Sequence, residues 1–61
     1  MNSEQIKGKW NQIKGNVKQK YGVEMNDDET FSEGKFDEVV GKIQEKTGKA
    51  KEDIKKEIAS W

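Results

Sequence analysis

The glycines of this chain are spaced at regular seven-residue intervals. They form two runs, offset by 26 residues: Gly8, Gly15 and Gly22, then Gly34, Gly41 and Gly48. The 61-residue sequence contains no proline, so glycine is its main helix-breaking residue. Each glycine inside a helix costs about 1 kcal/mol relative to alanine. A chain that accepts this cost repeatedly either lets another backbone approach its helices or keeps those helices near the folding threshold.

Apolar residues in the first third of the chain recur at helical intervals. At about 100° per residue, five of them share one helical face: Ile6, Trp10, Ile13, Val17 and Tyr21. The glycines at 8 and 15 fall on the opposite face. We predict one helix over residues 3–21, with Asn2 or Ser3 as its N-cap and Gly22 as the left-handed residue that ends it.

The middle of the chain carries a second helix-start signal. Asn26-Asp27-Asp28-Glu29 has the form of a capping box, with Asn26 as N-cap and Glu29 at the third helical position. This pattern predicts that a short helix carrying Phe31 begins there. We expect a kink or break around Gly34.

Two further apolar stripes follow. The first comprises Phe36, Val39, Val40 and Ile43, and we expect its helix to end at Gly48. The second, in a helix from about Lys49, comprises Ala50, Ile54 and Ile58 at intervals of four, with Trp61 as a final anchor. Three of the glycines lie inside the predicted helices and away from these stripes, so they are candidates for a special role: Gly8, Gly15 and Gly41.

The two halves of the chain align with each other. Residues 8–22 match residues 34–48 without a gap, glycine on glycine and aromatic on aromatic. We predict a single domain, 1–61, with repeat units at about 6–22 and 32–48 and a C-terminal helix over 49–60. The predicted fold is all-α, a small bundle of three to four helices built as two crossed helical hairpins. Its predicted core comprises Trp10, Ile13, Val17, Phe36, Val39, Ile43 and Ile54.

Charge is unevenly distributed along this formally neutral chain. Residues 1–22 carry a charge of +4, residues 23–38 a charge of −6 and residues 39–61 a charge of +2. This layout favours internal charge complementarity over a nucleic-acid surface. It leaves one alternative open, in which the lysine-rich N-terminal helix binds an anionic partner, either nucleic acid or a membrane surface.

The composition argues against catalysis. The chain has no histidine and no cysteine, so the usual general base and thiolate ligands are missing. Ser3, Ser32 and Ser60 therefore lack an activating histidine, and we interpret Asp27-Asp28-Glu29 as an acidic first helical turn rather than a metal site. We expect that the protein is not an enzyme and that it binds no cofactor and no metal. No apolar segment approaches a membrane span, so we expect a cytoplasmic protein without integral membrane association. We also expect a monomer.

Several motifs resemble the CsbD-like family of bacterial general stress proteins. Gly8-Lys9-Trp10, then Gly15, Val17-Lys18 and Gly22, are similar to the first half of that family. The second half of the family is matched by these residues of the chain: Asp27-Asp28, Glu33-Gly34-Lys35, Asp37, Val40-Gly41-Lys42-Ile43-Gln44-Glu45 and Gly48. The resemblance implies a small cytosolic helical protein induced by general stress, without a known enzymatic activity. It also implies a composition like that of hydrophilins, the glycine-rich hydrophilic proteins associated with water deficit.

Overall fold

Four helices make up the part of the chain that the computed structural model describes, residues 3–26 and 29–61. They are α1 (Ser3–Gly8), α2 (Trp10–Tyr21), α3 (Glu33–Thr47) and α4 (Lys51–Ala59). The predicted all-α bundle is confirmed, since the described residues contain no strand.

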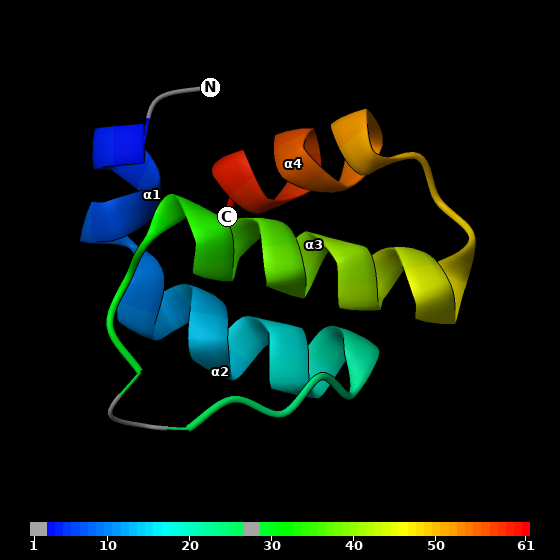
Figure 1. Cartoon of the computed structure of the whole chain (residues 1–61), viewed down its shortest axis with the longest axis horizontal. Coiled ribbons are helices and arrows are strands. Elements are labelled where there is room, and N and C mark those ends of the chain that lie inside the picture. The colour runs from blue at the N-terminus through cyan, green and yellow to red at the C-terminus, as the bar shows by residue number, and fades with distance from the viewer. Residues whose placement is uncertain (1–2, 27–28) are drawn as a thin grey trace.

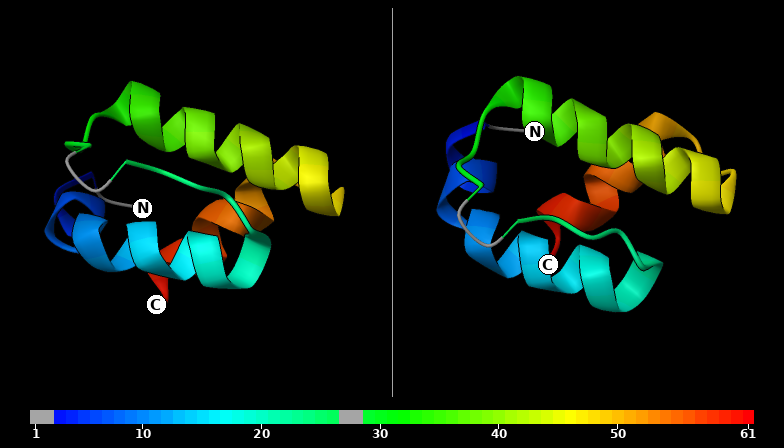
Figure 2. Two further views of the ribbon diagram at one scale, coloured as in Figure 1. Left: turned by 90° about the horizontal axis from the view of Figure 1, so that it is seen from below. Right: turned by 60° about the horizontal axis from the view of Figure 1, so that its bottom comes forward.

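The helices pack around a pair that runs in the same direction. Figures 1 and 2 show α2 and α3 side by side, with α4 returning antiparallel to α3 on one side of them. The connection from α2 to α3, described at 22–26 and 29–32, runs back along the opposite side of the pair. Helices α2 and α3 are therefore covered by α4 on one side and by extended chain on the other.

The single helix expected over residues 3–21 is wrong, because the chain turns at Lys9. Lys9 has φ −101° and ψ 5°, and its N–H donates to Ile6 O at 3.1 Å, so this one residue separates the end of α1 from the start of α2. The turn follows Gly8, the weakest helix former in this stretch. The short helix α1 before the turn still buries Ile6, which is 1% exposed. The alternative N-cap Asn2 lies outside the described residues, and Ser3 lies inside α1 rather than capping it.

The short helix expected to begin at Asn26 is also wrong. The described residues on either side of positions 27 and 28 are not helical, although the Glu29 N–H donates to Asn26 O at 3.1 Å in a turn. The true start lies further on, where the extended Ser32 accepts a hydrogen bond from the Lys35 N–H at 3.1 Å. The expected break near Gly34 is wrong as well, because Gly34 lies inside the first turn of α3.

Both predicted helix ends at glycine are confirmed. Gly22 and Gly48 are left-handed, with φ of 67° and 73°, and their N–H groups donate to carbonyls of the preceding turn. The last helix begins two residues later than expected, at Lys51, with Ala50 in extended backbone before it. These two glycines are therefore explained by local backbone geometry alone.

The core is a single cluster of eleven buried apolar residues. All seven side chains expected there are buried, at 7% exposure or less. The other four are Ile6, Val23, Val40 and Ile58. Val23 lies in no helical stripe, but a hydrophobic residue directly after a left-handed C-cap often packs back on its helix. That rule would have identified it from the sequence.

Candidate functional site

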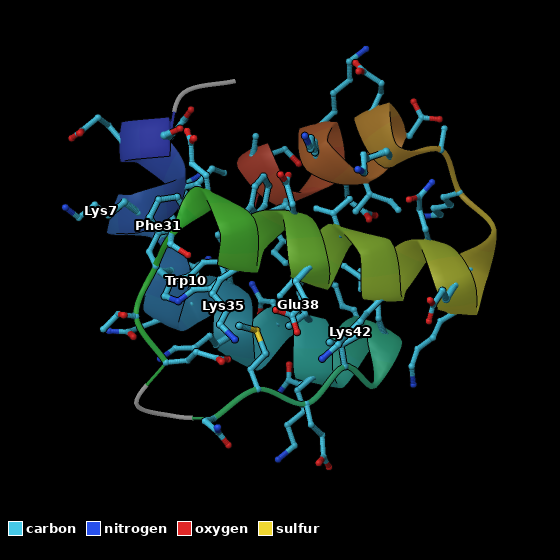
Figure 3. The ribbon with its side chains drawn as sticks, in the orientation of Figure 1. Lys7, Trp10, Phe31, Lys35, Glu38 and Lys42 are labelled. Carbon is cyan, nitrogen blue, oxygen red and sulfur yellow. The ribbon has the colours of Figure 1, made fainter. Side chains whose placement is uncertain are left out.

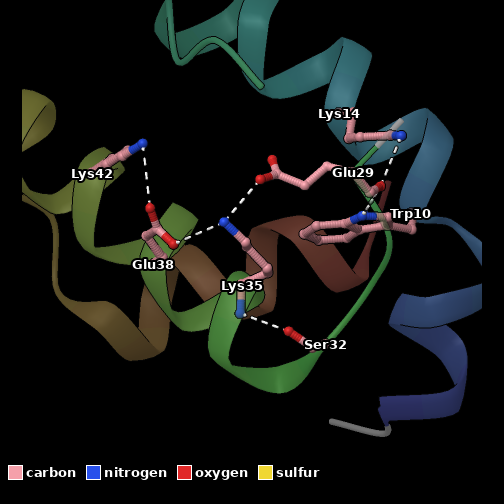
Figure 4. Close-up of polar contacts among 7 residues, drawn as sticks. All are labelled: Trp10, Lys14, Glu29, Ser32, Lys35, Glu38 and Lys42. Atoms are coloured by element: carbon pink, nitrogen blue, oxygen red, sulfur yellow. Dashed lines mark hydrogen bonds and ion pairs between the residues drawn. The ribbon is translucent and has the colours of Figure 1, made fainter. Parts of the chain in front are cut away.

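Glu29 fastens the connection between α2 and α3 to both of those helices. Its main-chain oxygen accepts hydrogen bonds from the Trp10 indole N–H and from Lys14 Nζ, each at 3.1 Å. Its carboxylate forms an ion pair with Lys35 Nζ at 2.8 Å. Figure 4 shows these groups converging from α2, the connection and α3. We call Trp10, Lys14, Glu29 and Lys35 the Glu29 junction.

The junction continues along α3 as a chain of ion pairs. Lys35 Nζ also lies 3.5 Å from a carboxylate oxygen of Glu38, and Lys42 Nζ lies 3.6 Å from the other. Figure 3 shows Lys35, Glu38 and Lys42 following one another along the helix. Ion pairs this exposed contribute little to stability, so they orient the junction more than they stabilise the fold.

Both charged side chains of the junction are held in their ionised forms. The hydrogen bond from Lys35 lowers the pKa of Glu29 below its ordinary value of 4.5. The same hydrogen bond raises the pKa of Lys35 above its ordinary value of 10.5. Near neutral pH neither group is ready to give or take a proton, so the pair is suited to a structural role and not to acid–base catalysis.

The Glu29–Lys35 pair makes stability depend on pH in a defined direction. The folded pKa of Glu29 lies below its unfolded value, so the pair's contribution is fully present above about pH 4.5. It is lost as the pH falls through the folded pKa. Glu29→Gln should therefore lower the melting temperature at neutral pH, and the difference from the parent protein should vanish near about pH 2.

Thermal melts followed by circular dichroism across this pH range would measure the effect. Glu24→Gln is a matched control, because Glu24 is an exposed acid in the same connection. It should shift the melting temperature less at neutral pH. A Glu29→Gln difference that persists unchanged in acid would show that the carboxylate charge has no part in holding the connection.

Two of the N-terminal lysines are used inside the molecule. Lys9 Nζ donates to the main-chain oxygens of Ala59 and Trp61, at 3.1 and 2.6 Å, where α4 ends. Lys14 reaches Glu29 as described above. A lysine at the carbonyl end of a helix is favourable because that end carries partial negative charge. These two lysines tie the beginning of α2 to segments far away in sequence.

The aromatic residues near these lysines are also engaged within the fold. Trp10 is only 4% exposed, and its ring meets Phe31 edge to face at 5.3 Å. Tyr21 stacks on Trp61 with ring centroids 6.4 Å apart, and Lys20 Nζ lies 5.5 Å from the centroid of the Trp61 ring. Trp10 is therefore not available as a stacking platform for a nucleic acid base.

The candidate glycines Gly8, Gly15 and Gly41 point to open space. A Cβ built on any of the three would have no heavy atom within 4 Å, apart from its own helix backbone and chain neighbours. Among the described glycines, positive φ occurs at the two helix ends, Gly22 and Gly48. Neither intramolecular packing nor backbone conformation therefore requires glycine at positions 8, 15 and 41.

Alanine at Gly8, Gly15 or Gly41 should stabilise the isolated protein. Each replacement should raise the free energy of unfolding by roughly 0.5–1 kcal/mol, because alanine restricts the unfolded chain and meets no neighbour in the fold. Gly22→Ala and Gly48→Ala are the controls, and each should lose about 1 kcal/mol or more in its left-handed conformation. Urea denaturation measures all five variants, and a loss of stability at position 15 would contradict the open geometry found there.

The remaining surface offers little for catalysis. A hollow of about 270 Å³ lies among α1, α3 and α4 and is lined by both apolar and charged residues: Ser3, Ile6, Phe31, Glu33, Phe36, Asp37 and Lys55. All three serines are engaged within the fold, since Ser3 donates to Glu33, Ser32 caps α3 and Ser60 donates to Glu57 O. No three acids of the described residues gather as a metal site, and Asp27 and Asp28 lie outside those residues. None of the described helices has the length and apolar character needed to cross a membrane.

Comparison with known proteins places the chain in a family. The family model described as CsbD-like matches residues 4–56. The UPF0337 protein YjbJ of Escherichia coli O6:H1 is 48% identical over 61 residues, which is 100% of this chain and 88% of YjbJ. A UPF0337 protein of Pseudomonas aeruginosa is 41% identical over 61 residues, 100% of this chain and 94% of that protein. No solved structure matches the chain. The chain belongs to the CsbD-like family, a family of general stress-response proteins.

Proposed function

We propose that this protein is a non-enzymatic general stress-response protein of the cytoplasm. It is a small, monomeric, hydrophilin-like domain that acts through its abundance and solubility rather than through a catalytic site. Membership of the CsbD-like family supports the stress role. The composition supports the mode of action, because 39% of the residues are charged and only 30% are hydrophobic. Such a chain remains hydrated when water becomes scarce.

The observation that carries the proposal is the open space around the helical glycines. Gly8, Gly15 and Gly41 weaken their helices, and no packing contact within the protein depends on them. A domain of this size with eleven core residues has little stability to spare. Glycines of this kind keep the helices close to the folding threshold, where the chain can change its degree of order as conditions change.

The experiment uses a strain that lacks the gene and is supplied with different versions of the protein. The parent protein should restore survival after osmotic upshift or drying. The triple variant Gly8→Ala, Gly15→Ala and Gly41→Ala should be more stable but should protect less. Survival of the gene-deleted strain equal to that of the parent strain under these stresses would contradict the stress role itself.

A matched control separates helix stability from the chemistry of the helix surface. Gln5, Gln12 and Gln19 are exposed beside the glycines, and glutamine is a good helix former. Alanine at these three positions changes that surface with little change in stability. The glutamine variant should protect as well as the parent. Equal protection by the parent and the triple glycine variant would refute the role assigned to marginal helices.

A further inference from the structure

The exposed side of residues 5–21, which include most of α1 and all of α2, is basic and carries no acid. Residues 5–21 contain five lysines and neither aspartate nor glutamate, and the nearest acids in sequence are Glu4 and Glu24. Seven polar side chains of this stretch are exposed. Lys20 lies over the Trp61 ring and Gln5 lies at the start of the stretch, so we call the other five the basic face: Lys7, Asn11, Gln12, Lys18 and Gln19. The face is positive although the whole chain is formally neutral.

The structure separates these lysines from the ones that serve the fold. Lys9 and Lys14 are turned inward onto main-chain oxygens. Lys7 projects away from the helices at the edge of the molecule, as Figure 3 shows. Lys18 lies on the solvent side of α2, one residue after the buried Val17. The lysines of the basic face are therefore the ones positioned to meet a partner.

We propose that the basic face docks on the phosphate backbone of duplex nucleic acid, without reading its sequence. Lysine is a point charge that suits phosphate, and the amides of Asn11, Gln12 and Gln19 can donate hydrogen bonds to phosphate and sugar oxygens. At Gly15 a Cβ would meet no heavy atom within 4 Å, so a phosphate group can approach the α2 backbone closely. The proposal adds a partner to the stress role and does not depend on it.

The same residues argue against the other anionic partners. An interfacial membrane helix needs an exposed apolar side, and Ile6, Trp10, Ile13 and Val17 are all buried at 4% exposure or less. Single-stranded nucleic acid needs exposed aromatic rings, and the basic face has none. Binding to the phosphates of a duplex requires only positive charge and hydrogen-bond donors on a helix surface, and the basic face provides both.

Binding of this kind should be weak and steeply dependent on salt. Contact through the two lysines of the basic face corresponds to a slope of about −1.8 in the logarithm of affinity against the logarithm of salt concentration. Affinity should then fall roughly 12-fold between about 50 and 200 mM salt. Because the net charge of the protein is zero, the rest of the molecule adds no long-range attraction to the nucleic acid.

The test is a titration of a fluorescently labelled DNA duplex of unrelated sequence, followed by anisotropy at low salt. Lys7→Gln with Lys18→Gln should reduce the salt slope by about 1.8, the share of two phosphate contacts. Lys51→Gln with Lys56→Gln makes the same change in net charge at exposed positions of α4 and should leave the slope unchanged. Circular dichroism confirms that both variants fold.

A second variant adds repulsion without touching any lysine. Gln12→Glu with Gln19→Glu places two acids on the exposed side of α2 and should abolish duplex binding while the helix remains folded. The proposal is overturned if the parent protein does not bind at low salt, or if the α4 pair loses as much affinity as the basic-face pair. It is also overturned if polyglutamate displaces the duplex as well as unlabelled duplex does, or if anionic vesicles bind as tightly.

Discussion

Trp10→Ala should reduce the free energy of unfolding by about 3–5 kcal/mol, which is enough to unfold most of the protein at room temperature. Trp10 fills the space between α2 and the connection, where it is 4% exposed and packs edge to face on Phe31. Its indole N–H also donates to Glu29 O. Alanine removes the ring, leaves a cavity and withdraws one of the two donors to the main-chain oxygen of Glu29.

Urea denaturation followed by circular dichroism would measure this loss, and Trp10→Phe separates its two causes. Phenylalanine keeps an aromatic ring in the same place, and Lys14 still donates to the Glu29 oxygen. The loss should then be closer to about 1 kcal/mol, the contribution of one hydrogen bond and a modest change in volume. If Trp10→Ala melts within a degree or two of the parent protein, the core assigned to this end of α2 is wrong.

Phe36→Ala should have the second large effect, again about 3–5 kcal/mol. Phe36 is 7% exposed on α3 and borders the hollow shared with Ile6 and Phe31. Because the sequence alignment of the two halves places Phe36 opposite Trp10, the two substitutions remove equivalent aromatic rings. The ring of Phe36 makes no polar contact, so its loss is one of packing alone.

Phe36→Leu is the control for that packing, and the same urea denaturation measures both variants. Leucine retains most of the buried apolar volume and should lose only about 1 kcal/mol. A loss below about 1 kcal/mol for Phe36→Ala would mean that the hollow collapses around the smaller side chain. Comparable losses for Trp10→Ala and Phe36→Ala would support the two repeat units, 6–22 and 32–48, which stay a prediction.

The sequence predicted the parts of the fold that depend on local pattern. The apolar stripes identified the residues that are buried in α2, α3 and α4, and Gly22 and Gly48 marked two helix ends because left-handed backbone there favours glycine. Ser32, followed by Glu33, is an N-cap signal that could have placed the start of α3 correctly. The capping-box pattern at Asn26 predicted an earlier helix start, and that prediction was wrong.

The sequence could not predict the parts that depend on distant contacts. The turn at Lys9 places its amine on carbonyls 50 and 52 residues further along the chain. Residues 29–32 are not helical, and Trp10 and Lys14 bind the main-chain oxygen of Glu29 there. Tertiary contacts of this kind override local helix signals, and no spacing rule in this sequence indicated the Glu29 junction.

The contact between Lys9 and the end of α4 has a consequence for synthesis of the protein. The start of α2 is held by residues at the end of α4, which are translated about 50 residues later, and Ile54 and Ile58 supply two of the eleven core side chains. A nascent chain that has reached only Gly48 has no partner for the apolar side that α3 will present to α4. The core can therefore close only after α4 has been synthesised, and a chain stalled before α4 should be more susceptible to proteases than the complete bundle.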